Sequence, residues 1–407
     1  MAREIILQKL PVGWSYNLLD NIAERCSGHT PSKSFPEYWN GGIKWISLAD
    51  SCRLDKGYVY ETDKEISLEG IKNSSAEVHP AETVVLSRDA GVGKSGVMAT
   101  PMAVSQHFIA WKCDNKEKLH SWYLYNWLQL NKEEFERQAV GSTIKTIGLP
   151  YFKKLRIAVP PFDEQKKIAQ ILSTWDKAIS VTEKLLTNSQ QQKKALMQQL
   201  LTGKKRLLDE RGVRFSGEWE YTIFGNLGDT YTGLTGKTKE DFGAGKPYIP
   251  YINIFKNSRI DIQNLEYVQV NDDERQSVVK YGDIFFTTSS ETPEEVGMSS
   301  VLLEEVSEVF LNSFCFGFRL NNFETLIPKY ARYLFRSEHV RRQISTLGQG
   351  ATRYNLSKRQ LIKLELKLPC VEEQQKIAAV LSAADAEIST LEKKLACLRD
   401  EKKALMQ

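Results

Sequence analysis

The chain has 407 residues, of which 41% are hydrophobic and 10% aromatic, enough for two or three domains with apolar cores. The formal net charge is only +4, so overall charge alone does not demand a polyanionic partner. A polyanion would have to be bound by local patches such as Lys204-Lys205-Arg206 or Arg341-Arg342. No run of about 18 apolar residues occurs, which excludes a membrane-spanning helix, and the N-terminal MAREIILQKLP lacks the apolar segment of a signal peptide.

The cysteines and histidines predict neither disulfides nor a metal site. No C-x-x-C pair is present, so the thiols are interpreted as the reduced thiols of a cytoplasmic protein. The histidines show no H-x-x-x-H spacing and no nearby cysteine pair, and we expect them in the core or on the surface. No cofactor is predicted.

The first lobe is expected to span residues 1–159. Thr83 to Ser87 has the apolar, β-branched composition of a buried strand, and Leu119 to Arg137 has a helical pattern. The remaining segments are short β-type runs interrupted by Gly, Asn and Ser. These features predict an α+β lobe.

The segment Gly91-Val92-Gly93-Lys94-Ser95 resembles part of a phosphate-binding loop. That motif requires a glycine five positions before its second glycine, and Arg88 stands there instead. A turn after the strand is therefore the favoured interpretation.

A long helix is predicted next, within a segment spanning residues 160–206. Asp163 is a plausible N-cap after two prolines, and Gly203 a plausible stop, which gives a helix from Glu164 to Leu201. Its apolar residues follow the steps of three and four that are typical of a coiled-coil seam, and they are Ile168, Leu172, Trp175, Ile179, Leu186, Leu196 and Leu200. Thr182, Ser189 and Lys193 weaken the middle of that seam.

The start of this helix also resembles a catalytic motif. Val159-Pro160-Pro161-Phe162 is similar to the Asn-Pro-Pro-aromatic motif of adenine methyltransferases, but Val159 cannot form the hydrogen bonds of that asparagine. No glycine-rich loop for S-adenosylmethionine is recognisable. The prolines are interpreted as the end of a strand and the start of a helix.

The second lobe is expected to span residues 207–368 and to be α+β as well. Asp283 to Thr287 predicts a buried strand, and Lys329 to Ile344 a helical region. Glu365-Leu366-Lys367 matches the end of a nuclease motif, but the preceding aspartate that would share the metal is missing.

The segment 369–407 repeats the first long helix. Residues 164–198 and 373–407 align without a gap at an offset of 209, with 19 identities in 35 positions. The second copy has its own seam, with Lys402 as the one interruption; its members are Ile377, Leu381, Ala384, Ile388, Leu391, Leu395, Leu398 and Leu405. A period of half the chain indicates an internal, pseudo-twofold duplication of lobe and helix.

This pattern of variable lobe and fixed helix, written twice, resembles the specificity subunit of type I DNA restriction-modification enzymes. The resemblance is carried by PPFDEQKKIAQIL with QQLLTGKKRL, and by PCVEEQQKIAAVL. The lobe endings GSTIKTIGLPYFKKLRIAVPP and GQGATRYNLSKRQLIKLELKLP support it. One departure is that the second helix lacks a counterpart of residues 200–208.

The resemblance implies a fold and a set of partners. Each lobe would be a target recognition domain for one half of a bipartite DNA sequence, and the two helices would pair antiparallel as a coiled-coil spacer. The implied partners are double-stranded DNA, two modification subunits that methylate adenine, and restriction subunits with translocase and nuclease activity. The chain itself would not be an enzyme.

Loop residues with polar or charged side chains are the candidates for DNA contacts, because such side chains bind base edges and phosphates. In the first lobe the predicted residues are Lys33, Ser87, Arg88, Lys94, Ser95, Thr143 and Lys145. In the second they are Lys237, Lys239, Thr288, Ser289, Ser290, Arg353, Tyr354 and Asn355.

Two other classes of function remain open at this point. The chain could be a self-sufficient DNA methyltransferase or nuclease, which the defective motifs argue against. It could also be a coiled-coil scaffold that never contacts DNA. Binding of S-adenosylmethionine by the chain alone would favour the first alternative, and failure to bind DNA would favour the second.

Overall fold

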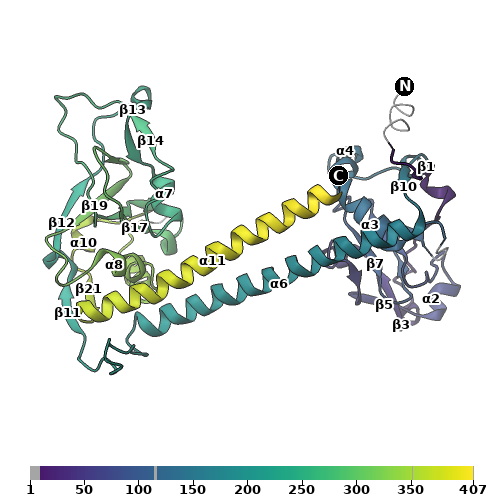
Figure 1. Cartoon of the computed structure of the whole chain (residues 1–407), viewed down its shortest axis with the longest axis horizontal. Helices are drawn as coiled ribbons and strands as arrows, with labels where there is room; N and C mark the ends of the chain where they lie inside the picture. The colour runs from purple at the N-terminus through teal and green to yellow at the C-terminus, as the bar shows by residue number, and fades with distance from the viewer. Residues whose placement is uncertain (1–9, 114–116, 351, 407) are drawn as a thin grey trace. The chain divides into compact units, whose positions relative to one another are not determined.

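The computed structural model describes residues 10–113, 117–350 and 352–406. The chain divides into two compact units, Met1–Glu183 with Lys394–Gln407, and Lys184–Lys393. Each unit contains one lobe and a part of both long helices (Figure 1). The boundaries predicted at residues 159, 206 and 368 separate lobes from helices and remain an interpretation. Most of the N-terminal segment considered for a signal peptide lies outside the described residues.

The first lobe is α+β, as predicted. Strand β1 (Ser15–Leu18) pairs with β10 (Arg156–Val159). The main sheet has the strand order β2 (Glu24–Ser27), β9 (Phe108–Lys112), β6 (Val84–Ser87), β7 (Ser95–Met98) and β4 (Tyr58–Val59). A smaller sheet has the order β5 (Lys64–Ile66), β3 (Trp39–Ile46) and β8 (Ala103–Val104). Its helices are α2 (Leu68–Lys72), α3 (Ser121–Leu130), α4 (Lys132–Gln138) and α5 (Leu149–Phe152), with short 3-10 turns at Leu19–Asn21, Pro36–Tyr38 and Leu48–Cys52.

The second lobe has the same architecture. Strand β11 (Glu220–Ile223) pairs with β21 (Glu365–Leu368), and β16 (Ser289–Ser290) pairs with β20 (Tyr354–Asn355). The main sheet has the strand order β12 (Gly228–Thr232), β19 (Cys315–Leu320), β15 (Ile284–Thr287) and β17 (Ser299–Val301). A smaller sheet has the order β14 (Glu266–Val268), β13 (Phe242–Ile249) and β18 (Phe310–Leu311). Its helices are α7 (Tyr251–Lys256), α8 (Pro328–Leu334), α9 (Glu338–Thr346) and α10 (Lys358–Leu361), with 3-10 turns at Phe224–Asn226, Lys239–Asp241 and Pro293–Glu295.

Strand pairing confirms that the lobes are two versions of one fold. In both lobes a strand with a register shift pairs antiparallel on one side and parallel on the other. The parallel partners are Trp45 with Ala103 in β3 and β8, and Tyr248 with Phe310 in β13 and β18. Strand β4 corresponds to an isolated parallel bridge of Arg259 with Val301 in the second lobe, and the pair β16–β20 corresponds to a bridge of Asp89 with Thr146 in the first.

The predicted strands at Thr83–Ser87 and Asp283–Thr287 are confirmed as β6 and β15, and each lies inside its sheet. All residues of both strands are buried, which explains their nearly continuous apolar sequence. Helix α3 packs on β6 and β7, and α8 packs on β15 and β17. These helices cover equivalent faces of the two sheets and close the two main cores.

Each predicted helical region is divided into two helices. In the first lobe the break comes at Asn131, which ends α3 with φ −94° and ψ 13°. In the second lobe Ser337 caps α9, because its hydroxyl accepts a hydrogen bond from the Val340 amide. Asparagine and serine favour such boundaries because their side chains compete for backbone groups.

The two long helices are α6 (Phe162–Leu200) and α11 (Val371–Met406). Helix α6 begins earlier than predicted, so Asp163 lies within its first turn and is not the N-cap. The carbonyl of Pro161 accepts the amides of Glu164 and Gln165, at 2.9 and 3.0 Å, and starts the helix. Gly203, with φ +71°, follows the last turn as expected of a helix stop.

The long helices are antiparallel within each unit. In the first unit Trp175 donates to Glu401 and Arg399 donates to Glu183, so α6 residues of rising number meet α11 residues of falling number. The second unit shows the same order, because the Ser189 hydroxyl donates to Glu387 and Lys193 pairs with Asp385 (Figure 1). The antiparallel coiled coil is therefore confirmed.

The seam of α11 is partly corrected by the structure. Ile377 and Leu381 are buried as predicted, but Leu405 is 51% exposed and does not belong to the seam. Lys402, which interrupts the apolar pattern, forms an ion pair with Asp176 at 2.6 Å. Two polar positions in the seam of α6 also contact α11, because Ser189 donates to Glu387 and Lys193 pairs with Asp385.

A repeated glutamine fixes each lobe to its long helix. The buried Gln165 side chain accepts from the His120 amide and donates to the carbonyls of Lys118 and Pro160. The buried Gln374 does the same in the second lobe with the backbone of Ile327, Thr325 and Pro369. Both amides satisfy backbone groups that would otherwise be buried without partners.

Candidate nucleic-acid interface

Three loops meet at one end of the main sheet in each lobe. The first loop follows β6 (residues 88–94) or β15 (residues 288–298), and the second precedes β9 or β19. The amide of Arg88 donates to the carbonyl of His107 at 2.9 Å, and the amide of Thr288 donates to that of Phe314 at 3.0 Å. The first two loops are therefore joined by the same backbone hydrogen bond in both lobes.

The third loop closes each lobe and lies against the first. Asp89 forms a β-bridge with Thr146, and Ser289 pairs with Asn355 in β16 and β20. Thr146 and Asn355 are separated by 209 positions, the offset of the long helices. We call residues 88–94, 105–107 and 140–147 the first loop surface, and residues 288–298, 312–314 and 349–356, without Ala351, the second loop surface.

The first loop surface is polar and partly cationic. Thr143 and Lys145 are exposed, while the Arg88 side chain is mostly buried, 3.8 Å from Asp89. The Asp89 carboxylate lies 2.8 Å from Nδ1 of His107. The predicted residues Arg88, Thr143 and Lys145 are thus brought together, and His107 and Asp89 join them.

The second loop surface combines hydroxyl, amide and guanidinium groups with an exposed aromatic ring. It holds the predicted residues Thr288, Ser289, Ser290, Arg353, Tyr354 and Asn355. Phe314 beside them is 63% exposed, and the Tyr251 hydroxyl donates to the carbonyl of Ser289 at 3.0 Å. A pocket of about 380 Å³ is lined by Tyr251, Ile252, Phe255, Ser289, Phe314 and Arg353, among others.

Three predicted residues of the first lobe have structural contacts. Ser95 is fully buried, and its hydroxyl accepts from Gln129 at 2.8 Å. Ser87 is buried and donates to the carbonyl of Asp89, while the Lys94 ammonium donates to the Ser51 hydroxyl at 3.0 Å. In this structure these groups stabilise the turn after β6, which also confirms that this segment is a turn between two strands.

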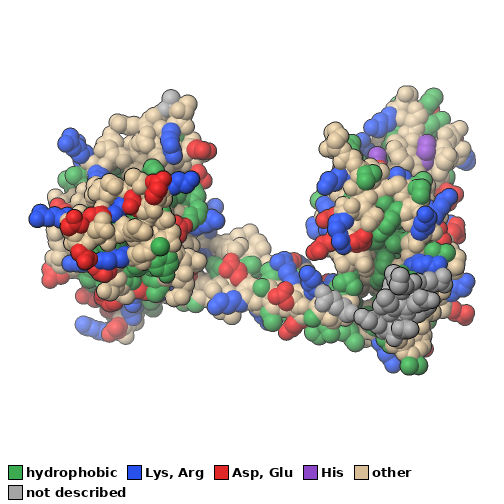
Figure 2. Space-filling model, turned by 90° about the horizontal axis from the view of Figure 1, so that it is seen from above, with side chains coloured by type: hydrophobic (Ala, Val, Ile, Leu, Met, Phe, Trp, Pro, Cys, Tyr) green, Lys and Arg blue, Asp and Glu red, His purple; other side chains and the backbone are tan. Residues whose placement is uncertain are grey.

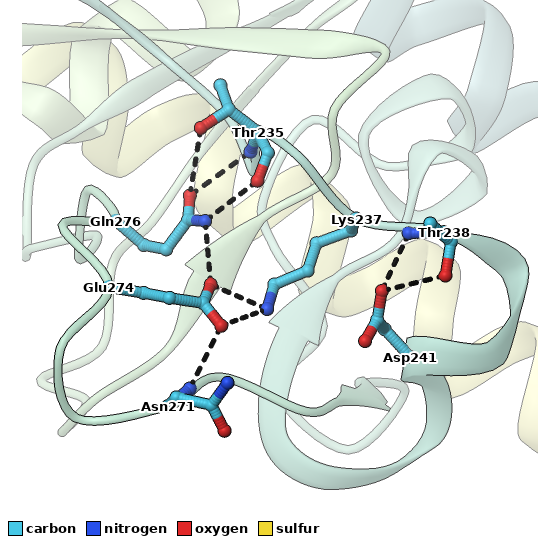
Figure 3. A network of polar contacts seen from close by, with 7 residues as sticks. All are labelled: Thr235, Lys237, Thr238, Asp241, Asn271, Glu274 and Gln276. Carbon is cyan, nitrogen blue, oxygen red and sulfur yellow. Dashed lines mark hydrogen bonds and ion pairs between the residues drawn. The ribbon is translucent and has the colours of Figure 1, made fainter.

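Lys237 is held in a polar network (Figure 3). Its side chain is 6% exposed, and the ammonium forms an ion pair with Glu274 at 2.5 Å. Lys237, Gln276 and the amide of Asn271 all donate to Glu274 and lower the pKa of its carboxyl to about 2. The ammonium of Lys237 is therefore paired with a carboxylate of its own lobe. The neighbouring Lys239 is exposed, and so is Lys33 in the first lobe.

In each of the two basic patches considered from the sequence, one arginine is used in packing, whereas Lys204, Lys205 and Arg342 are exposed. Arg206 donates two hydrogen bonds, at 2.6 and 2.7 Å, to the fully buried Glu373. Arg341 donates to the carbonyls of Gly297, Glu294 and Val296, and burial lowers its pKa to about 10. Arg341 thereby holds the first loop of the second loop surface in place.

Charges of both signs are mixed over the face of the molecule that Figure 2 shows. Blue Lys and Arg side chains alternate with red Asp and Glu side chains, and no large area of this face has a single sign. This agrees with the small net charge of +4. Any binding of a polyanion would therefore depend on a few placed side chains.

The comparison with protein families decides the identity of the lobes. The model of the type I restriction modification DNA specificity domain matches residues 11–188 and again residues 217–398. The chain belongs to this family. Two such domains, together with the named relatives below, make it a specificity subunit of a type I restriction-modification system, as the repeated motifs predicted.

Curated relatives carry the same description. The MjaVIII specificity subunit of Methanocaldococcus jannaschii is 24% identical over 86% of this chain and 85% of its own length. The EcoKI specificity subunit of Escherichia coli is 22% identical over 95% of this chain and 85% of its own. The MjaIX specificity subunit is 28% identical, but that match covers only 45% of this chain and 42% of the relative.

Solved structures show the same fold. The type I specificity subunit of M. genitalium is 16% identical, with a TM-score of 0.57 over 98% of this chain and 96% of that one. A structure concerned with complex assembly of a type I system has a TM-score of 0.58 over 98% and 97%. At these identities the likeness establishes the fold of this specificity subunit, including the paired helices.

Some residues of the loop surfaces were missed by sequence reasoning. Asp89, His107 and Phe314 join the predicted residues in the structure, and Tyr251 of α7 contacts the second loop surface. A lobe-on-lobe alignment with variable offset could have found His107 and Phe314, which both precede an apolar strand.

Within the described residues, no helix is both long and apolar enough to cross a membrane.

Proposed function

We propose that each lobe of this specificity subunit recognises one half of a bipartite DNA target through its loop surface. The observation that supports this proposal is the repeated construction of the two surfaces. The same backbone hydrogen bonds join the same loops, yet the side chains on them differ, for example His107 against Phe314. A fixed frame that presents different side chains is the arrangement expected of two lobes with different half-sites.

The side chains suit both kinds of DNA contact. Lys145 and Arg353 are exposed cations that can bind phosphate oxygens or guanine edges. Asn355 is exposed and can form two hydrogen bonds with adenine. The exposed Phe314 ring can contact a thymine methyl group or stack beside a displaced base.

The partners follow from the same proposal. The paired helices would set the number of unrecognised base pairs between the half-sites and would bind two modification subunits, which then recruit restriction subunits. Methylation of a base in the duplex requires that the base be turned out of the stack. This chain would supply no catalytic group to that reaction and would act in the cytoplasm, where the DNA is.

Binding measurements separate this function from the alternatives. The purified chain should bind duplex DNA with an affinity that falls as salt rises, because phosphate contacts release counterions. It should not bind S-adenosylmethionine by itself. Failure to bind DNA in the presence of modification subunits would favour a scaffold, and binding of S-adenosylmethionine by the chain alone would favour an enzyme.

A single substitution tests the assignment of the second loop surface. Asn355→Ala, assembled with modification subunits, should relax methylation at one position of one half-site, at a cost of about 1–3 kcal/mol for a lost bidentate base contact. Asn321→Ala is the control, because Asn321 is exposed in the same lobe outside the loop surface. Methylation mapping in which both variants keep the original sequence would contradict the assignment.

A further inference from the structure

Three potential metal ligands lie together in the first lobe, toward the end of β9 opposite His107. Cys26 is on β2, and Glu77 and His79 lie in the segment before β6. One ligand atom of each residue lies within 4.8 Å of the ligand atoms of the other two. Cys26 is separated from Glu77 and His79 by more than 50 positions in the sequence, so no spacing motif reveals the cluster.

The histidine of this cluster is buried without a partner. His79 is 0% exposed, and neither of its ring nitrogens has a hydrogen-bond partner within the described part of the chain. A buried imidazole left in this state is unfavourable, because each polar atom has lost its water.

The charges around the cluster suit a divalent cation. Lys112 and Glu24 lie beside it and form an ion pair at 2.9 Å, which leaves the Glu77 carboxylate as the uncompensated charge. Loss of the Cys26 proton to solvent on binding would add a thiolate, and the two negative charges would balance a dication. The Glu24 Oε1 atom, 3.8 Å from the Cys26 sulfur, accepts from Lys112, so Glu24 would become a fourth ligand only by leaving that ion pair.

We propose that Cys26, Glu77 and His79 bind a zinc ion. One thiolate, one imidazole and carboxylate oxygens are ligands that zinc accepts, whereas magnesium and calcium prefer oxygen alone. The ion would connect the edge strand β2 to the segment that is bridged, through His79, to Met102. Its role would be structural, because the site would tie together elements of the sheet and lies apart from the loop surface.

Cobalt substitution tests the site in the full-length chain. The protein is freed of metal with a chelator and titrated with Co²⁺, whose absorption reports both tetrahedral geometry and a thiolate ligand. One equivalent should give the thiolate-to-cobalt charge-transfer band, and Zn²⁺ should displace it. Zinc should also raise the midpoint of thermal unfolding, because it binds the folded state.

Two variants and one control make the assignment specific. Cys26→Ser should abolish the charge-transfer band, and Glu77→Gln, at an exposed position, should weaken zinc binding by at least about tenfold, since even residues behind the ligands contribute about 10–100-fold. Cys52→Ser removes an exposed thiol of the same lobe and should change nothing. The proposal is overturned if the parent chain shows no thiolate band, or if Glu77→Gln and Cys26→Ser, with unchanged circular dichroism, bind zinc as the parent does.

Discussion

At the residue scale, the glutamines at the starts of the two long helices connect each helix to its lobe, although polar residues at such positions are usually exposed. Gln165 and Gln374 are buried, and each makes three hydrogen bonds to backbone groups of its own lobe. Their conservation between the two repeats reflects this shared connection of lobe to helix. The identity of the residues was visible in the sequence, but the connection was not.

Substitution of the second glutamine should loosen its lobe. Gln374→Ala removes the partner of the Ile327 amide and of two carbonyls, and one unsatisfied buried group costs about 1–3 kcal/mol. We expect a lower midpoint of thermal unfolding. Gln375→Ala, at the adjacent exposed position, is the control and should leave the midpoint unchanged. Equal effects of both variants would contradict the role of Gln374.

The network around Glu274 predicts a dependence on pH in the acid range. Lys237, Gln276 and Asn271 lower the pKa of Glu274 from 4.5 to about 2 in the folded lobe. Because the folded pKa is depressed, the contribution to stability is complete above about pH 4.5 and is lost as the pH falls toward 2. Thermal unfolding between pH 5 and 2 should show a smaller acid loss in Glu274→Gln than in the parent chain. An unchanged acid profile in that variant would count against the network.

Sequence reasoning placed many of the candidate DNA contacts on the loops that form the two loop surfaces, but some of their side chains are buried or paired within the lobe. Ser95 is buried because Gln129 of α3 covers it, and Lys237 is paired with a glutamate 37 positions away. Neither partner is visible from local sequence. Phe314 was missed because the candidates were loop residues with polar or charged side chains. His107 was missed because the histidines were expected in the core or on the surface without a binding role.

At the element scale, two ion pairs at equivalent positions of the repeat connect the two long helices. Asp176 pairs with Lys402 in the first unit, and Asp385 pairs with Lys193 in the second. The two aspartates, and the two lysines, are each separated by 209 positions. An ion pair between the helices forms in one alignment only and so favours that register.

Exchange of the charges tests this register device. Asp176→Lys places two ammonium groups together and should destabilise the helix pair by about 1 kcal/mol, a modest amount because the Asp176 side chain is partly exposed. The double variant Asp176→Lys with Lys402→Asp should recover most of that loss. Thermal unfolding of the parent, both single variants and the double variant gives the coupling energy. No recovery in the double variant would exclude a direct pair.

Elements with strong periodicity were predicted well, and their ends were not. The buried strands β6 and β15 and most of the helix seam were correct, because apolar burial decides them, whereas the antiparallel direction of the helices was expected from the family resemblance. The start of α6 was displaced because Pro161, and not Asp163, provides the first acceptor. Leu405 was assigned to the seam by spacing alone, although its side chain is mostly exposed.

At the scale of the whole molecule, the chain contains a duplicated unit of one lobe and one long helix. The two helices are similar in sequence, and the two lobes differ in the side chains of their loops. This organisation predicts that the helices act as a spacer between two separate recognition events. The duplication and its family were recognisable from the sequence, because the helix repeats align without a gap. The recognised bases were not, because they depend on side-chain positions in contact with DNA.

Lengthening both helices should lengthen the unrecognised spacer. Four helix-forming residues inserted near Asn188, and four near Cys397, add about 6 Å and a net turn of about 40°. DNA rises about 3.4 Å and turns about 34–36° for each base pair. For helices that run along the duplex, methylation mapping should show the same half-sites with one or two more base pairs between them. An active variant with an unchanged spacer would contradict the role of the helices.

The most direct test of the central claim is an exchange of one lobe. Residues 1–155 are replaced by the corresponding lobe of another specificity subunit, and the DNA of cells that carry the hybrid with its modification subunits is mapped for methylation. Two independent lobes predict that one half-site changes while the other half-site and the spacer stay the same. A change in both half-sites at once would show that the lobes do not recognise DNA separately.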